Sequence, residues 1–264
     1  MTLNLIDIAS YQSNIDLAAV FAQNPLHGVI VKATEGLGYV NPNCDKWVQW
    51  LRKNGKLWGF YHYLNGSDPR TEAERFVRDT KNYFGEGVPV ADYEGQIVSS
   101  YGTYYLRRFL ETVYELTGVK CLVYCNLSTI QGDVNGFRQI AADGYCLWLA
   151  QYASSNPQYG FRETPWQQGS YAPFPRITMH QYSDHGRLSG YGGNLDLDIF
   201  YGDSLTWKAL AAKIPAIPQT PAEPAPEPVS EQDWLQDWID YLQAEIDEKQ
   251  AKIDELKARQ REVR

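Results

Sequence analysis

The stretch "VPVADYEG", residues 88–95, sets the first constraint on the fold. Mostly apolar residues lead to two carboxylates, Asp92 and Glu94, and a glycine follows at once. A short apolar run that ends at a turn residue is typical of a buried strand. Because residues i and i+2 of a strand share a face, we expect both acids to point the same way, with Cα atoms about 6.6 Å apart. Like charges in one partly buried place raise the pKa of at least one acid, which suits a general acid.

Seven further segments show the same short apolar character. They are residues 3–9, 28–36, 57–64, 121–126, 145–152, 177–183 and 195–202. Helical spacing of apolar residues separates the early ones, at 43–55, 69–85 and 101–118. Strands that alternate with helices predict a parallel α/β sheet, and eight of them suggest a closed barrel. The segment 154–175 has many turn residues and no helical period, so we expect fewer than eight helices.

Polar and aromatic side chains gather where the predicted strands end. Catalysis in α/β barrels takes place at the C-terminal ends of the strands. Each residue alone has a structural explanation: a core histidine, a core aromatic ring or an ion pair. Their joint placement at one rim favours a functional site. The candidates besides Asp92 and Glu94 are Asp7, Lys32, Glu35, Tyr61, His62, Tyr124, Trp148, Asp196 and Asp198.

The composition excludes several classes of partner. The formal net charge is −8, whereas nucleic-acid binding needs clustered Lys and Arg, so we expect no nucleic-acid partner. No window approaches the roughly 18 apolar residues of a membrane span. The first residues, "MTLNLIDIASYQ", lack the basic and apolar regions of a signal peptide. We therefore expect synthesis in the cytoplasm without a Sec-type signal, and no membrane partner.

Cysteine and histidine spacing gives no sign of a disulfide framework, metal or cofactor. The four Cys are widely spread, and none of the four His belongs to an HExxH motif. We expect free thiols and no cofactor. The 19 Tyr and 8 Trp suit a carbohydrate groove, because such rings can stack and hydrogen-bond at once, although they also suit ordinary cores.

The composition changes sharply near residue 213, which divides the chain into three parts. Residues 1–212 form the predicted barrel, 213–229 a Pro-rich extended linker, and 230–264 a helix without Gly or Pro. Its apolar residues alternate at spacings of three and four, as in a coiled-coil heptad. An isolated helix of this kind is marginal in water, so we expect it to pair with a second copy, preferably as a dimer. Packing back onto the barrel is the alternative.

The charges leave the orientation of that pairing open. In a parallel dimer Lys252 at position g would face Lys257 at position e of the partner. An antiparallel pairing would instead bring Glu245 near Lys252 or Arg259.

Six ordered motifs carry a resemblance to a known family. "IDIASYQ", "VKATEG", "GFYHY", "VADYEG", "LWLAQY" and "HQYSDHG" with "GNLDLDIFYG" resemble glycoside hydrolase family 25, the Chalaropsis-type lysozymes, and phage endolysins in particular. The resemblance covers the whole predicted barrel but neither the linker nor the last helix. It implies a flattened TIM-like barrel of eight strands with about five helices. It also implies N-acetylmuramidase activity on bacterial peptidoglycan.

The resemblance also implies roles for individual residues. Glu94 matches the general acid and Asp92 its companion carboxylate, while Asp7 and Asp196 match further acids of the same pocket. The sugar-contacting positions that it implies, together with neighbouring candidates, are Lys32, Glu35, Tyr61, His62, Tyr124, Trp148 and Gln181. The sequence departs at Asp198, where relatives commonly carry Asn; we expect an altered substrate contact or an altered local pKa there. An endolysin would stay in the host cytoplasm until a holin-type opening of the membrane. The expected lack of a Sec-type signal equally fits a bacterial protein exported by a non-Sec route.

Spacing alone leaves the mechanism open. Carboxyl groups about 5–5.5 Å apart indicate retention and about 6.5–9.5 Å inversion, and side-chain rotamers shift that separation either way. A third route uses the acetamido oxygen of the substrate as nucleophile. Our hypothesis is that Glu94 protonates the leaving oxygen while Asp92 steadies the acetamido group. Two rival functions are a non-catalytic glycan-binding barrel and an amidase or endopeptidase, for which Cys125 and His62 are the best nucleophile pair available.

Overall fold

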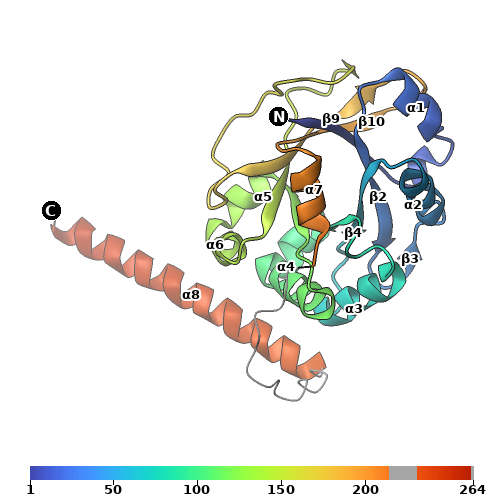
Figure 1. Ribbon diagram of the computed structural model, residues 1–264. Helices are drawn as coiled ribbons and strands as arrows, with labels where there is room; N and C mark the ends of the chain where they lie inside the picture. Colours follow the sequence, from blue (N-terminus) through green and yellow to red (C-terminus); the bar gives the residue numbers. More distant parts are fainter. Residues whose placement is uncertain (214–230, 263–264) are drawn as a thin grey trace. The chain divides into compact units, whose positions relative to one another are not determined.

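The computed structural model describes residues 1–213 and 231–262. Two compact units divide the chain, Met1–Ala216 and Ile217–Arg264. The first unit contains all eight predicted strands and is built around them (Figure 1). The strands are β1 (Leu3–Ile8), β2 (Gly28–Glu35), β4 (Leu57–Tyr63), β5 (Val88–Asp92), β6 (Leu122–Asn126), β7 (Cys146–Ala150), β9 (Ile177–Arg187) and β10 (Leu195–Phe200).

These strands close into a barrel, which confirms the predicted fold class. Their order is β1-β10-β9-β7-β6-β5-β4-β2, and pairing between β1 and β2 closes the ring. Two-residue strands, β3 (Tyr39–Val40) and β8 (Gln158–Tyr159), pair with β2 and β9. Every barrel pairing is parallel except those of β10, which runs antiparallel to both neighbours. The connection at residues 188–194 is too short for a crossover to a parallel strand, which needs about a dozen residues.

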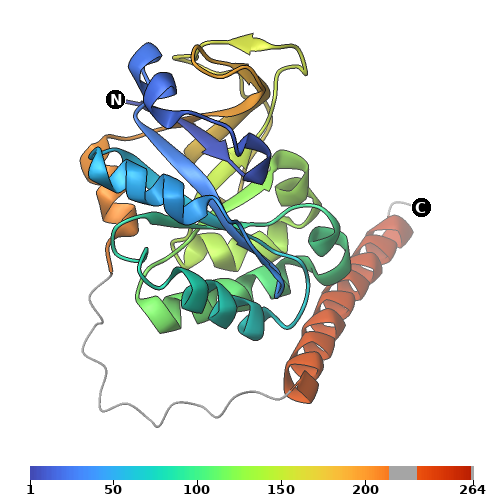
Figure 2. The same cartoon turned by 90° about the vertical axis from the view of Figure 1, so that its right-hand side faces the viewer.

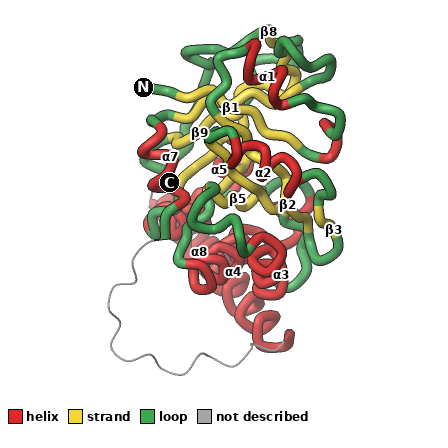
Figure 3. Tube along the Cα trace, turned by 45° about the vertical axis from the view of Figure 1, so that its right-hand side comes forward, coloured by secondary structure: helices red, strands yellow, loops and turns green. Residues whose placement is uncertain are grey.

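Helices cover the outside of the barrel and one of its ends. Figures 2 and 3 show the helices arranged around the central strands. The three predicted helices are confirmed as α2, α3 and α4, although α4 begins before residue 101. The described part of the segment 154–175 contains no helix, as expected. The resemblance implies about five helices, and the first unit has more. They are the one-turn η1 (Ser10–Gln12) and α1 (Leu17–Gln23), α2 (Cys44–Lys53), α3 (Pro69–Thr80), α4 (Gln96–Thr117), α5 (Leu127–Gly132), α6 (Val134–Ala142) and α7 (Ser204–Ala211).

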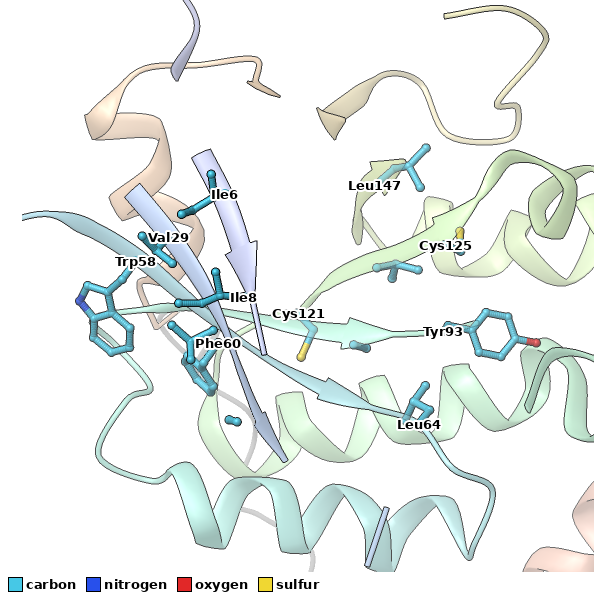
Figure 4. Close-up of a cluster of buried hydrophobic side chains, with 14 of the residues drawn as sticks. Ile6, Ile8, Val29, Trp58, Phe60, Leu64, Tyr93, Cys121, Cys125 and Leu147 are labelled. Atoms are coloured by element: carbon cyan, nitrogen blue, oxygen red, sulfur yellow. The ribbon is translucent and has the colours of Figure 1, made fainter. Parts of the chain in front are cut away.

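Two apolar layers hold this architecture together, because alternate residues of each strand face opposite sides. One layer lies between the strands and the helices, and Figure 4 shows part of it, including Ile6, Phe60 and Leu147. The other fills the barrel interior. There Trp207 of α7 packs edge-on against Phe200 at 5.1 Å between ring centroids. Trp207 also donates from its Nε1 to the carbonyl oxygen of Trp58 at 3.2 Å, so α7 covers the end of the barrel at which β4 begins.

The second unit is a single described helix, α8 (Glu231–Glu262). The predicted linker lies outside the described residues, except for Lys213. The described apolar side chains that the heptad predicts are about half exposed on the helix. Among those described, they are Leu235, Ile239, Leu242, Ile246 and Ile253, with exposed fractions of 36% to 58%. Within the two described ranges, no helix is both long and apolar enough to cross a membrane.

Candidate active site

A pocket of about 200 Å³ opens at the end of the barrel where the parallel strands finish. It gathers eight of the residues that the sequence singled out and adds two, Tyr152 and Asp184. The predicted residues that line it are Asp7, Tyr61, Asp92, Glu94, Tyr124, Trp148, Gln181 and Asp196. Half of these are acids, and most of the others carry aromatic rings. The sequence prediction of one shared rim therefore describes most of this pocket.

Asp92 and Glu94 reach the pocket from the end of β5. Strand β5 ends at Asp92, two residues earlier than predicted, yet the alternation of faces continues and both acids line the pocket. Tyr93 between them is buried in the outer apolar layer. Gly95 then has φ of +70° and ψ of −142°, a conformation that favours glycine. This turn lets α4 begin directly after Glu94.

Burial raises the pKa of both acids and so favours their protonated forms. Desolvation raises the pKa of Asp92, and the charge of Glu94 raises it further against the opposing effect of Lys32. Desolvation also raises the pKa of Glu94, again opposed by Lys32. Among the described residues no hydrogen-bond partner reaches Asp92 Oδ1, which is buried. Because buried polar atoms are normally paired, this oxygen is suited to accept a hydrogen bond from a ligand.

Asp7 and Asp196 form a second acidic pair on adjacent strands. They are register partners across β1 and β10. Asp196 was expected at a strand end, but it lies near the start of β10, and the reversed direction of this strand brings it to the same rim. Burial raises the pKa of Asp7 to about 6. Burial and the charge of Asp7 raise the pKa of Asp196 to about 9.

Gln181 links the acids to the aromatic wall of the pocket. Its Nε2 donates to Asp7 Oδ2 at 2.6 Å. Its Oε1 accepts from the hydroxyls of Tyr124, at 2.8 Å, and Tyr152, at 2.5 Å. The ring of Tyr124 meets Trp148 edge-on, with centroids 4.8 Å apart. Rings held rigidly beside polar atoms give a surface on which a sugar can stack and hydrogen-bond.

Lys32 and Glu35 lie beside the pocket and are not among the residues that line it. They form an ion pair with 2.6 Å between Nζ and Oε2. The Lys32 ammonium also lies 4.7 Å from the centroid of the Tyr63 ring, close enough for a cation–π contact. Lys32 thus acts on the pocket through its charge, which lowers the pKa of both Asp92 and Glu94.

Comparison with known proteins gives the family. The model of the glycosyl hydrolases family 25 matches residues 6–191, which include Asp7, Asp92 and Glu94, whereas Asp196 follows the matched range. The chain belongs to glycosyl hydrolase family 25.

One curated relative supports this assignment, and solved structures share the fold. An autolytic lysozyme of Clostridium acetobutylicum is 30% identical over 198 residues, which are 74% of this chain and 55% of the relative. The chain thus spans about half the length of that relative. A lysozyme structure from Streptomyces coelicolor shares the fold with a TM-score of 0.63 at 22% identity, covering 79% of this chain and 96% of the other. A family 25 lysozyme structure from Aspergillus fumigatus gives 0.63 at 23% identity, with coverage of 80% and 100%.

His62 is not part of the family 25 pocket, and its proposed contact with sugar is wrong. Its side chain is completely buried on the outer face of β4. Its Nδ1 lies 2.7 Å from Thr34 Oγ1 and its Nε2 lies 3.0 Å from Glu72 Oε1. Its ring stacks on Phe109 at 5.2 Å between centroids. The period of two in a strand places His62 opposite Tyr61, so the sequence already contained this information.

Asp198 is likewise closed to a direct substrate contact. It faces the barrel interior below the family 25 pocket and is 0% exposed. Trp148 Nε1 donates to Asp198 Oδ1 at 3.0 Å. The expected perturbation of pKa is present: burial, with the charges of Asp7 and Asp196, raises the pKa of Asp198 well above its ordinary value.

Sequence reasoning missed two residues of the family 25 pocket, Tyr152 and Asp184. Tyr152 follows β7 directly, at the end of the motif "LWLAQY", and Asp184 lies within β9 in "HQYSDHG". Both motifs were noted for other residues. Asp184 Oδ1 lies 2.6 Å from His185 Nδ1. The alternation of faces along β7 already places Tyr152 on the inner side with Trp148 and Ala150. By contrast, Asp184 reaches the pocket through the length of β9 and its irregular register with β10.

Proposed function

We propose that this chain is a peptidoglycan hydrolase that cleaves the β-1,4 bond between N-acetylmuramic acid and N-acetylglucosamine. The observation that carries this proposal is the pair Asp92 and Glu94, which enter one pocket with raised pKa values beside an aromatic wall. Glycoside hydrolysis needs an acid that is still protonated near neutral pH and a second carboxyl group close to it. A barrel that only binds glycans has no need for such a pair.

Glu94 is the proposed general acid. Its raised pKa keeps a proton available for the leaving glycosidic oxygen. Asp92 then steadies the acetamido group, because its buried Oδ1 can accept a hydrogen bond from the acetamido N–H. The acetamido oxygen attacks the anomeric carbon as the glycosidic bond breaks, and the resulting cyclic intermediate is opened by water. The hydrogen bond from the acetamido N–H favours the ionised form of Asp92. In that form its negative charge stabilises the positive charge that develops on the ring.

The stereochemistry of the product tests this mechanism. Two successive displacements at the anomeric carbon return the β configuration. Proton NMR of the first-formed product, taken before mutarotation, is expected to show the β-anomer. An α-anomer as first product would rule out participation of the acetamido group.

The chemistry of the new chain ends tests the cleaved bond. Purified peptidoglycan is digested, reduced with borohydride, hydrolysed and analysed by mass spectrometry. Muramitol is the expected product, because reduction marks the sugar that carried the broken bond. Glucosaminitol would mean cleavage of the other glycosidic bond. Released stem peptides would mean an amidase, and the absence of any product would mean a binding barrel.

The thiol route to an amidase has little support in the site. Cys125 is completely buried in the outer apolar layer, where desolvation raises the pKa of its thiol. A thiolate nucleophile needs the opposite shift. His62, its only suggested base, has both ring nitrogens engaged by Thr34 and Glu72.

The proposal includes a role as a phage endolysin, which rests on the sequence motifs. An endolysin is held in the host cytoplasm and reaches the wall only after a holin-type opening of the membrane. Expression inside a bacterium is therefore expected to leave the culture intact until the membrane is permeabilised, for example with chloroform. Lysis without permeabilisation would contradict this role.

We also propose that α8 pairs two copies of the chain as a coiled coil, with residues 213–229 as the linker. The described apolar side chains of α8 repeat with the heptad and are about half exposed, which supports a partner that covers them. A dimer would present two barrels to one polymeric substrate and so raise the avidity for the wall. The orientation of the two helices remains open in this proposal.

A further inference from the structure

Asp198 has an unusual environment for a charged group. It is completely buried, and one oxygen, Oδ1, accepts a hydrogen bond from Trp148 Nε1 at 3.0 Å. No donor of the described residues reaches the other oxygen, Oδ2, which is also buried. A buried carboxylate oxygen without a donor is strongly unfavourable, whereas the hydroxyl of a neutral acid could itself donate.

The groups that face Asp198 provide an acceptor for such a donor. Asp7 of β1 pairs in register with Asp196, so Asp198 lies two residues further along β10 on the same inward face. The pKa of each acid is shifted by a side-chain hydrogen bond with the other. On its own strand the neighbouring acid is Asp196, and on β9 its register partner is Gln181. Tyr182 of β9 lies in the outer apolar layer, where the charge of Asp198 raises the pKa of its hydroxyl. Acids therefore dominate the charge around it, and burial together with these acids favours the neutral form.

We propose that Asp198 is a positioning residue that is held as a neutral carboxylic acid and orients Asp7 for the reaction. Its hydroxyl donates to Asp7, and its carbonyl oxygen accepts from Trp148. Gln181 Nε2 donates to Asp7 from the other side at 2.6 Å. Asp7 thus receives donors from Gln181 and Asp198, with Asp196 as a further side-chain partner, and these contacts fix its carboxylate at the pocket.

Every member of the resulting chain of hydrogen bonds has a consistent role. Trp148 donates to Asp198, Asp198 donates to Asp7, and Gln181 donates to Asp7 while it accepts from Tyr124. Four strands, β7, β10, β1 and β9, are linked in this way beneath the pocket, with β6 joined through Tyr124. Were Asp198 ionised, two carboxylates would face each other with no proton between them. An amide in place of Asp198 would supply the same donor and acceptor without an ionisable proton.

The proposal makes a prediction about stability that does not depend on catalysis. An acid whose pKa is higher in the folded state than the ordinary value of about 3.9 binds a proton that the unfolded chain releases. The free energy of unfolding then falls as pH rises from about 4 toward the folded pKa. Asp198→Asn removes the ionisable group and therefore the part of this fall in the free energy of unfolding that Asp198 causes. The gain in thermal midpoint of Asp198→Asn over wild type is therefore expected to grow from about pH 4 to about pH 7.

The direct test is carbon NMR of the full chain labelled with [4-¹³C]aspartate, compared with Asp198→Asn to assign the signal. The carboxyl resonance of Asp198 is expected at the position of a neutral acid at about pH 7, far above the ordinary pKa. A resonance that titrates near the ordinary pKa would overturn the proposal. This readout holds whether or not the variants are active.

The role in positioning is tested by kinetics on purified peptidoglycan, and this part rests on the proposed function. Asp198→Asn is expected to keep kcat within about threefold of wild type, whereas Asp198→Leu, with no donor for Asp7, is expected to lose about tenfold or more in kcat with a smaller change in KM. A large loss in a folded Asp198→Asn would mean that the charge is required, and full activity in Asp198→Leu would mean that Asp7 needs no such partner. If wild type produces no muramitol, the proposed function fails while the NMR result still decides the state of Asp198.

Discussion

Tyr105→Phe tests whether His62 belongs to the architecture or to the site. Tyr105 donates from α4 to Glu72 Oε2, and both side chains are buried. Burial acts to raise the pKa of Glu72, but hydrogen bonds from His62, Tyr105 and Asn65 outweigh it and the pKa is lowered. Burial lowers the pKa of His62, so the pair holds a neutral imidazole and an ionised carboxylate. Removing one hydroxyl therefore removes one hydrogen bond to a charged group.

The expected loss is about 1.5–3 kcal/mol in the free energy of unfolding, the usual contribution of a hydrogen bond to a charged partner. For a domain of this size that corresponds to a fall of roughly 3–12 °C in thermal midpoint. The sign of the pH dependence follows from the lowered pKa of Glu72. Its stabilising contribution is complete above the unfolded pKa and is lost as pH falls through the folded pKa. The deficit of Tyr105→Phe should therefore be full at neutral pH and shrink in acid.

Thermal or urea unfolding at several pH values measures this deficit, with hydrolysis rates at 25 °C as the second readout. Tyr114→Phe on the same helix serves as the control, because Tyr114 lies outside this network. We expect kcat to stay within about twofold of wild type, because no member of the network lines the pocket. A substantial loss of kcat in a stably folded Tyr105→Phe would show that this network belongs to the catalytic machinery and would refute the reasoning. An unchanged midpoint would refute the stabilising role of the bond.

Three further predictions concern the pocket and α8. Asp92→Asn should lower kcat by about 10²–10³ on purified peptidoglycan, because an amide cannot stabilise a developing positive charge; a loss below about threefold would contradict the role of Asp92. Asp196→Asn should raise the thermal midpoint at about pH 7 but not at about pH 4. An acid with a raised pKa lowers the free energy of unfolding as pH rises from its unfolded pKa to its folded pKa, which is about 9 for Asp196. An equal gain in midpoint at both pH values would contradict that pKa. Analytical ultracentrifugation should give a dimer for the full chain and a monomer for residues 1–212, and identical monomeric masses would end the coiled-coil proposal. If the shortened chain hydrolysed walls equally fast at low concentration, the avidity argument would be wrong.

Local pattern predicted the strands and the acidic pair of β5 because both depend on short-range features. Alternation of faces follows directly from backbone geometry, so the placement of Asp92 with Glu94 needed no tertiary information. The same rule separates Tyr61 from His62. His62 stands beside Tyr61 in "GFYHY", but neighbouring residues of a strand face opposite sides, so only Tyr61 of these two belongs to the pocket.

Features that depend on long connections were harder to predict. The direction of β10 follows from the short connection after β9, and it places Asp196 near the start of its strand, where the sequence suggested an end. Asp184 reaches the pocket through the extended β9 and its irregular register with β10, which no local period specifies. Tyr152, by contrast, continues the inward alternation of Trp148 and Ala150 and was predictable from the sequence. The departure at Asp198 was visible in the sequence, but its burial beneath Asp7 and its unpaired oxygen required the barrel to be closed.

The most direct test of the account is the rate of hydrolysis of purified peptidoglycan by Glu94→Gln, followed as newly formed muramic-acid reducing ends. The control is Glu86→Gln, which changes an exposed partner of Arg52 far from the pocket lining. The account predicts that Glu94→Gln folds with an unchanged or higher thermal midpoint and loses at least about 10²–10⁴ in kcat, the usual contribution of a general acid. The Glu86→Gln control should match wild type. A folded Glu94→Gln that keeps more than about a tenth of wild-type kcat would contradict the claim that Glu94 protonates the leaving group.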